Sequence, residues 1–81
     1  MNTDKYIGMD VHSETVSIAV RDSAGKLIME ATMAMETSAI LAFVKGLQGK
    51  RHVTFEEGIH AAWLYELLRP QVTELLVCDP R

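Results

Sequence analysis

Two acidic residues stand where they could bind a metal ion together. Asp10 ends the apolar run that begins at Tyr6, and Glu56 follows the short run that ends at Phe55. Carboxylate oxygens are hard ligands of the kind that Mg²⁺ prefers, usually with water and substrate phosphate. Two such ions about 3.5–4 Å apart can activate the attacking oxygen and stabilise the leaving oxygen in phosphodiester cleavage. Asp10 and Glu56 would begin such a site, and one or two further acids would be needed to complete it.

Each acid also has a simpler explanation. An acid that ends an apolar strand must be paired, hydrogen-bonded or metal-bound if it is buried, but Asp10 could equally begin a turn. Glu56 could be a solvated acid before a helix, whose dipole favours negative charge there. Glu57 shares this explanation and competes with Glu56 for the inward position. Asp79 could be a third acid at a strand end, although Pro80 after it favours a turn.

The histidines are weaker candidates for chemistry. His12 could lie near a bound metal, and a surface position after the strand is the alternative. His52 follows the basic pair Lys50 and Arg51, so it could join a phosphate-facing patch or simply be solvated. His60 is expected to be exposed in the first turn of a helix.

The elements that would position these residues can be predicted from the pattern of apolar residues. Segments rich in Val, Ile, Thr and Met predict three strands joined by short turns, over Tyr6–Val11, Thr15–Arg21 and Lys26–Ala34. Helical spacing then predicts a helix capped by Thr37 or Ser38 and ended by Gly49, and a second helix over Ile59–Arg69 with Ala62, Leu64, Leu67 and Leu68 inward. Two more strands are predicted, over His52–Phe55 and Glu74–Cys78.

This order of elements predicts an α/β fold with a mixed sheet. A three-stranded antiparallel meander is followed by helix, strand, helix and strand, and strands joined through a helix are expected to be parallel neighbours. The layout is that of a ribonuclease-H-like core. Because sites in open α/β sheets gather at the carboxyl ends of strands, parallel pairing of the first and fourth strands would bring Asp10 and Glu56 together.

Composition narrows the class of protein. The chain has 81 residues, which is one domain or part of one. Its net charge of -3 has the wrong sign for a self-sufficient DNA-binding protein. A single cysteine excludes an intrachain disulfide and favours a reduced, cytoplasmic protein. The N-terminus lacks the apolar core of a signal peptide, and no apolar run approaches the ~20 residues that span a bilayer. We therefore expect no membrane partner.

The residues resemble the opening of the DEDD-type insertion-sequence transposases, which have a RuvC-like N-terminal domain. The resemblance begins with YIGMDVHSETVSIAV from Tyr6 and continues through DSAGK, FEEG, AAWLYELL and VCDPR, so it covers nearly the whole chain. It implies a ribonuclease-H-like fold and a Mg²⁺ site of four acids. The first acid falls on Asp10 and the second on Glu56, which follows an apolar strand and precedes one residue and then Gly58.

The resemblance also implies that the chain is a fragment. The third and fourth acids of the family lie on a later helix as Asp-x-x-Asp, and the family's second catalytic region carries a nucleophilic serine. Neither is present in residues 1–81. We therefore expect the N-terminal part of a transposase catalytic domain, inactive alone, with weak or no Mg²⁺ binding. DNA and a guide RNA would be partners of the full-length parent.

Two other functions fit parts of the sequence. Actin-like and sugar-kinase-like ATP-binding proteins also open with an Ile-Gly-x-Asp strand. They need a glycine-rich turn that lets backbone amides approach phosphate, whereas the turn from Val11 to Thr15 has no glycine and adds Glu14. The third possibility is a non-enzymatic module that self-associates through an exposed sheet edge, which is a ready template for pairing.

Overall fold

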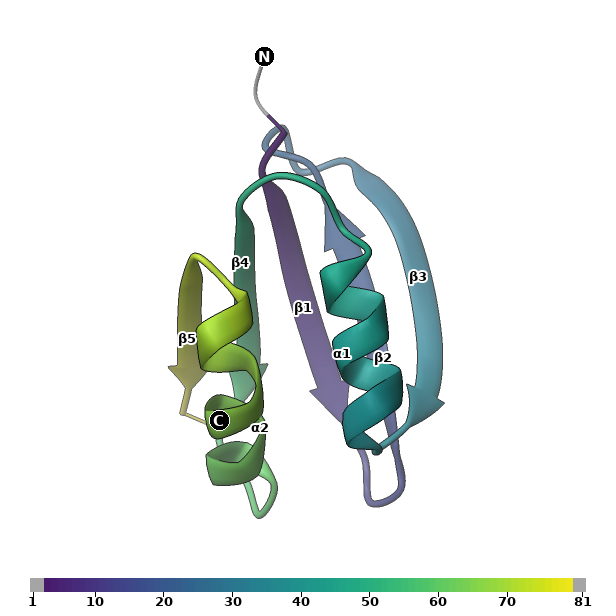
Figure 1. The fold of residues 1–81 in the computed structure, drawn as a ribbon, viewed down its shortest axis with the longest axis vertical. Helices are drawn as coiled ribbons and strands as arrows, with labels where there is room; N and C mark the ends of the chain where they lie inside the picture. Colours follow the sequence, from purple (N-terminus) through teal and green to yellow (C-terminus); the bar gives the residue numbers. More distant parts are fainter. Residues whose placement is uncertain (1–2, 80–81) are drawn as a thin grey trace.

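The computed structural model describes residues 3–79, which form a five-stranded mixed sheet with two helices (Figure 1). The strands lie in the order β3-β2-β1-β4-β5. In chain order the elements are β1 (Lys5–Val11), β2 (Thr15–Arg21), β3 (Leu27–Ala34), α1 (Thr37–Lys45), β4 (Arg51–Glu56), α2 (Ala61–Leu68) and β5 (Glu74–Cys78), with a short 3-10 helix (Arg69–Gln71) before β5.

The directions of the strands are those predicted from the order of elements in the sequence. β1, β2 and β3 form an antiparallel meander, whereas β4 pairs in parallel with both β1 and β5. The α/β class and the mixed sheet are therefore confirmed. The turn between β2 and β3 has the predicted chemistry, because Asp22 Oδ1 accepts hydrogen bonds from the amides of Ala24 and Lys26, each 2.9 Å long. Gly25 has φ +86°, a conformation that glycine adopts without a steric penalty.

Both helices cover one face of the sheet (Figure 1). Alternate residues of a strand point to opposite faces, and the residues that point toward the helices form the core. The core contains Ile7, Met9, Val16, Ile18, Val20, Val53 and Phe55 from the sheet and Ile40, Val44, Leu47, Leu64 and Leu68 from α1, α2 and the loop after α1. Within residues 3–79, no element covers the opposite face, which we call the open face.

The first helix differs from its prediction at both ends. Its N-cap is Glu36, whose side chain makes no capping hydrogen bond, and Thr37 is the first helical residue. The helix ends at Lys45 rather than near Gly49. Gly46 is its C-cap and still bonds to the carbonyl of Ala42, but the next amide, that of Leu47, bonds to Val44 only three residues back. Gly49 lies in the following loop with φ +88°, and a Cβ there would collide with Thr3.

The second helix is shorter than predicted. It begins at Ala61 rather than Ile59, which is 93% exposed. The prediction that Ala62 points inward was wrong, since Ala62 is exposed and its neighbour Ala61 packs against the core instead. Among the described residues, no helix is long and apolar enough to cross a membrane.

Candidate functional site

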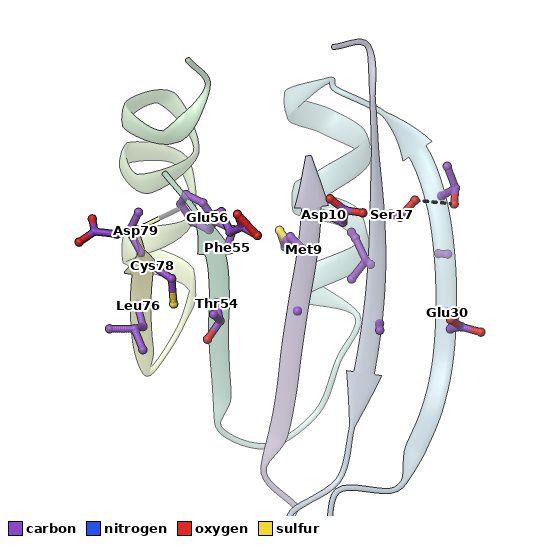
Figure 2. Close-up of a pocket in the computed structure, with 16 residues that line it drawn as sticks. Met9, Asp10, Ser17, Glu30, Thr54, Phe55, Glu56, Leu76, Cys78 and Asp79 are labelled. Atoms are coloured by element: carbon purple, nitrogen blue, oxygen red, sulfur yellow. Dashed lines mark hydrogen bonds between the residues drawn. The ribbon is translucent and has the colours of Figure 1, made fainter. Parts of the chain in front are cut away.

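The parallel pairing of β1 with β4 brings the two predicted acids to neighbouring strand ends. The register runs from Lys5 opposite Arg51 to Met9 opposite Phe55, so Asp10 and Glu56 are the next residues on each strand. Met9 and Phe55 are buried beneath the helices, and alternation therefore turns Asp10 and Glu56 to the open face. Figure 2 shows both side chains on the ends of these adjacent strands.

A broad hollow on the open face has the two acids at one end. Gly8 and Ala19 lie in its floor, where the absence of large side chains leaves space above the sheet. The charged residues that line it are all acidic: Asp10, Glu30, Glu56 and Asp79. Such a surface attracts cations and repels a phosphate backbone unless a cation lies between them.

A second hollow begins at the same strand ends and extends toward the start of α2. Asp10 and Glu56 line both hollows, so they stand on the boundary between the two. Glu57 and His60 line only the second hollow. Glu56 is therefore the acid that shares the open face with Asp10, whereas Glu57 lies beyond the end of β4.

Both acids are accessible to solvent. The Asp10 side chain is 78% exposed, and Glu56 is exposed as well. His12 Nε2 lies 3.6 Å from Asp10 Oδ2, close enough for an ion pair when the ring is protonated, and the His12 side chain is 55% exposed. Asp10 is therefore not a buried acid, because the open face is solvated at this point. Exposure leaves its carboxylate free to exchange water for another ligand.

Backbone contacts hold the loop after β4 against the end of β5. The amide of Glu57 donates a 2.7 Å hydrogen bond to the carbonyl of Cys78, immediately before Asp79. Asp79 lines the open-face hollow, but its carboxylate points away from Asp10 and Glu56 in Figure 2. The strand ends thus bring two acids together and leave the third apart. Within residues 3–79, no group of three or more His, Cys, Asp or Glu side chains could hold a metal ion.

Some residues of the open face were not singled out by sequence reasoning. Glu30 and Thr32 lie on β3 in register with Ala19 and Ser17, and the Ser17 and Thr32 hydroxyls are 3.2 Å apart. Alternation along β3 could have placed Glu30 on the same face as Asp10. His52 lies at the start of β4, at the opposite end of the sheet from Glu56, and binds carboxylates rather than joining a basic patch.

Comparison with known proteins adds no assignment. No protein-family model matches the chain, and no curated protein matches it. Any assignment of function therefore rests on the residues themselves and on the geometry of the strand ends.

Proposed function

We propose that the chain is the N-terminal part of a ribonuclease-H-like, RuvC-type catalytic domain of a DEDD-type transposase. The observation that carries the proposal is the parallel pairing of β1 and β4, which aligns Asp10 with Glu56 at neighbouring strand ends on the open face. The strand order β3-β2-β1-β4-β5 agrees with that fold, and the sequence motifs agree with that family.

In this proposal Asp10 and Glu56 are metal ligands. Their side chains supply hard oxygen ligands of the type that Mg²⁺ prefers. Proteins usually bind Mg²⁺ through one or two carboxylates, and water molecules supply other ligands. When bound, the metal would stabilise the charge that develops on phosphate oxygens. The acidic hollow would keep the phosphodiester backbone of DNA away from the sheet except where a cation neutralises the acids. The chain alone is expected to be inactive, because the family site requires two further acids.

Metal titration tests this assignment. We expect weak binding of Mn²⁺, a paramagnetic probe for Mg²⁺, to broaden the NMR signals of amides near Asp10 and Glu56. Asp10→Asn and Glu56→Gln each remove a charged ligand, and the double variant should lose the local broadening. Glu30→Gln is the matched control, because Glu30 lines the same hollow but lies on β3, two strands from β1.

Two results would contradict the proposal. Tight Mg²⁺ or Mn²⁺ binding that survives in the Asp10→Asn/Glu56→Gln variant would place the metal elsewhere. Thermal stabilisation by ATP would favour the actin-like alternative. The β1–β2 turn is evidence against that alternative. That turn is closed by a 2.8 Å bond from the His12 amide to the Thr15 carbonyl, and it carries Glu14, whose charge would repel phosphate.

A second candidate function is self-association. It is favoured by β3, an edge strand whose residues Leu27, Ile28 and Met29 are 40%, 43% and 41% exposed. An edge strand of this kind exposes unpaired backbone groups beside apolar side chains and can pair with another chain. Sedimentation analysis over a range of protein concentrations should then detect a dimer, and a monomer at every concentration would exclude it.

A further inference from the structure

The start of β4 carries a second cluster of polar residues, far from the acids at its other end. His52 Nδ1 lies 2.9 Å from Glu74 Oε1, and His52 Nε2 lies 3.2 Å from Asp4 Oδ2. The imidazole stacks on the ring of Tyr6, with 4.6 Å between centroids and an interplanar angle of 10°. These four residues, Asp4, Tyr6, His52 and Glu74, form the His52 cluster.

The His52 cluster joins three strands and the segment before them. Tyr6, His52 and Glu74 are register partners across β1, β4 and β5, and Asp4 directly precedes β1. β5 is an edge strand of only five residues. Its first residue is Glu74, so the bond to His52 fastens the beginning of this short strand to its neighbour.

The chemistry of imidazole makes this arrangement depend on protonation. A neutral imidazole has one N–H donor and one acceptor nitrogen, whereas an imidazolium donates from both nitrogens. A carboxylate only accepts. His52 can therefore satisfy Glu74 and Asp4 together only when it is protonated. In the neutral form, one ring nitrogen would face a carboxylate oxygen with no proton between them.

The basic side chains near the His52 ring donate their hydrogen bonds to backbone carbonyls instead of to the ring's carboxylate partners. Arg51, beside His52 on β4, directs its guanidinium to the carbonyls of Leu47, Gln71 and Lys45. Lys5, on β1, donates to the carbonyls of Thr3 and Gln48.

From β2, Arg21 lines the same small hollow as Tyr6, His52 and Glu74, and it donates to the carbonyl of Gly25. Within residues 3–79, the two carboxylates are therefore the charged groups in direct contact with the His52 ring.

We propose that the His52 cluster stabilises the sheet in a pH-dependent way. Protonated His52 donates to both Asp4 and Glu74, and so holds Asp4 and the edge strand β5 against β4. Deprotonation breaks one of these two hydrogen bonds. The His52 side chain is 19% exposed, so its contacts are only partly screened by solvent. The hydrogen bond to Glu74 raises the pKa of His52, the contact with Asp4 adds to this, and partial burial opposes it.

The sign of the effect on stability follows from the raised pKa. The folded state binds the proton more tightly than the unfolded chain, whose histidine has a pKa of about 6.5. The His52 cluster therefore stabilises the fold fully below that value, and the stabilisation is lost as pH rises through the higher pKa of folded His52. The sheet should loosen at β5 as pH rises through the pKa of folded His52.

NMR titration of the imidazole tests the pH-dependent role of the His52 cluster directly. We expect His52 in the folded chain to titrate at higher pH than in the urea-denatured chain, and the Asp4 and Glu74 carboxyl signals to move at the same midpoint as His52. Glu74→Gln should lower the His52 midpoint more than Asp4→Asn does, because Glu74 makes the shorter bond. Both substitutions keep the size of the side chain.

Stability measurements give an independent readout. Between about pH 6 and pH 8, where histidine titrates, the unfolding temperature of the Asp4→Asn/Glu74→Gln variant should change less than that of the original chain. The wild-type titration alone keeps the test decisive if this variant does not fold. A His52 midpoint equal in the folded and denatured chains would overturn the proposal.

Discussion

Trp63 and Leu64 are neighbours in α2 but have opposite surroundings. Leu64 is fully buried in the core, whereas Trp63 remains 38% exposed. We expect Leu64→Ala to lower the free energy of unfolding by about 2–5 kcal/mol, because it removes buried methyl groups and leaves a cavity. The whole free energy of unfolding of a chain of 81 residues is only about 4–12 kcal/mol. Urea denaturation would measure the loss.

Trp63→Ala is the matched control for this substitution. It removes a larger side chain from the same helix, yet much of that side chain already contacts water. A loss from Trp63→Ala as large as that from Leu64→Ala would show that residue size, rather than burial, governs the stability of α2.

At the same scale, the order of elements was enough to predict that Asp10 and Glu56 end neighbouring strands, but not how exposed they are. The sequence left open whether Asp10 is buried, and in the structure its side chain is 78% exposed. The reason is that apolar content along a strand does not reveal which of its two faces will be covered. The residues alone left Glu56 and Glu57 in competition for the inward position. The structure decides between them, because the burial of Phe55 turns Glu56 to the open face, and Glu57 lies beyond the end of β4. The His52 contacts depend on strand register, which no local pattern specifies.

Among the elements, the β2–β3 turn depends strongly on one side chain. Asp22 Oδ1 accepts two backbone hydrogen bonds, and the Asp22 amide donates to the Lys26 carbonyl over 2.9 Å. Each bond of this type contributes roughly 0.5–1.5 kcal/mol. We expect Asp22→Ala to lower the free energy of unfolding by about 1–2 kcal/mol, as measured by thermal or urea denaturation.

Asp22→Asn distinguishes the hydrogen bonds from the charge. Asparagine keeps a carbonyl oxygen at the same position, so its loss of stability should be smaller than that of alanine. Equal losses from Asn and Ala would mean that the carboxylate charge, rather than the acceptor atom, stabilises the turn.

Element types were predictable where periodicity was strong, and element ends were not. The strand Thr15–Arg21 has the predicted bounds, because alternating apolar residues and flanking turns define it on both sides. The first helix ends at Lys45 with Gly46 as its C-cap, although Gly49 is an equally good terminator by residue type. The choice between two glycines was made by tertiary structure, since Gly49 passes close to Thr3.

For the whole molecule, the order of elements was enough to predict a mixed sheet, but not which surfaces stay uncovered. The free edge at β3 is one such surface. We expect Ile28→Lys to abolish dimerisation through this edge, because a lysine there would have to lose its hydration on pairing. Sedimentation of the original chain and the variant at matched concentrations would measure the change.

Ile59→Lys is the matched control, since it makes the same substitution at a residue that is 93% exposed and lies outside the sheet. If Ile59→Lys dissociated the dimer as fully as Ile28→Lys, general solubility would explain the result and the β3 edge would not be the interface.

The pairing of β1 with β4 also has a consequence for the order of folding. Two strands of the meander and the whole of α1 separate these partners along the chain. Closing so long a loop costs entropy before any contact offsets it, so pairings of this kind tend to form late. The hairpins of the meander can form from local contacts before Glu56 reaches its place beside Asp10. The proximity of Asp10 and Glu56 is therefore acquired only when folding nears completion, and a partly folded chain would carry a complete meander without a site.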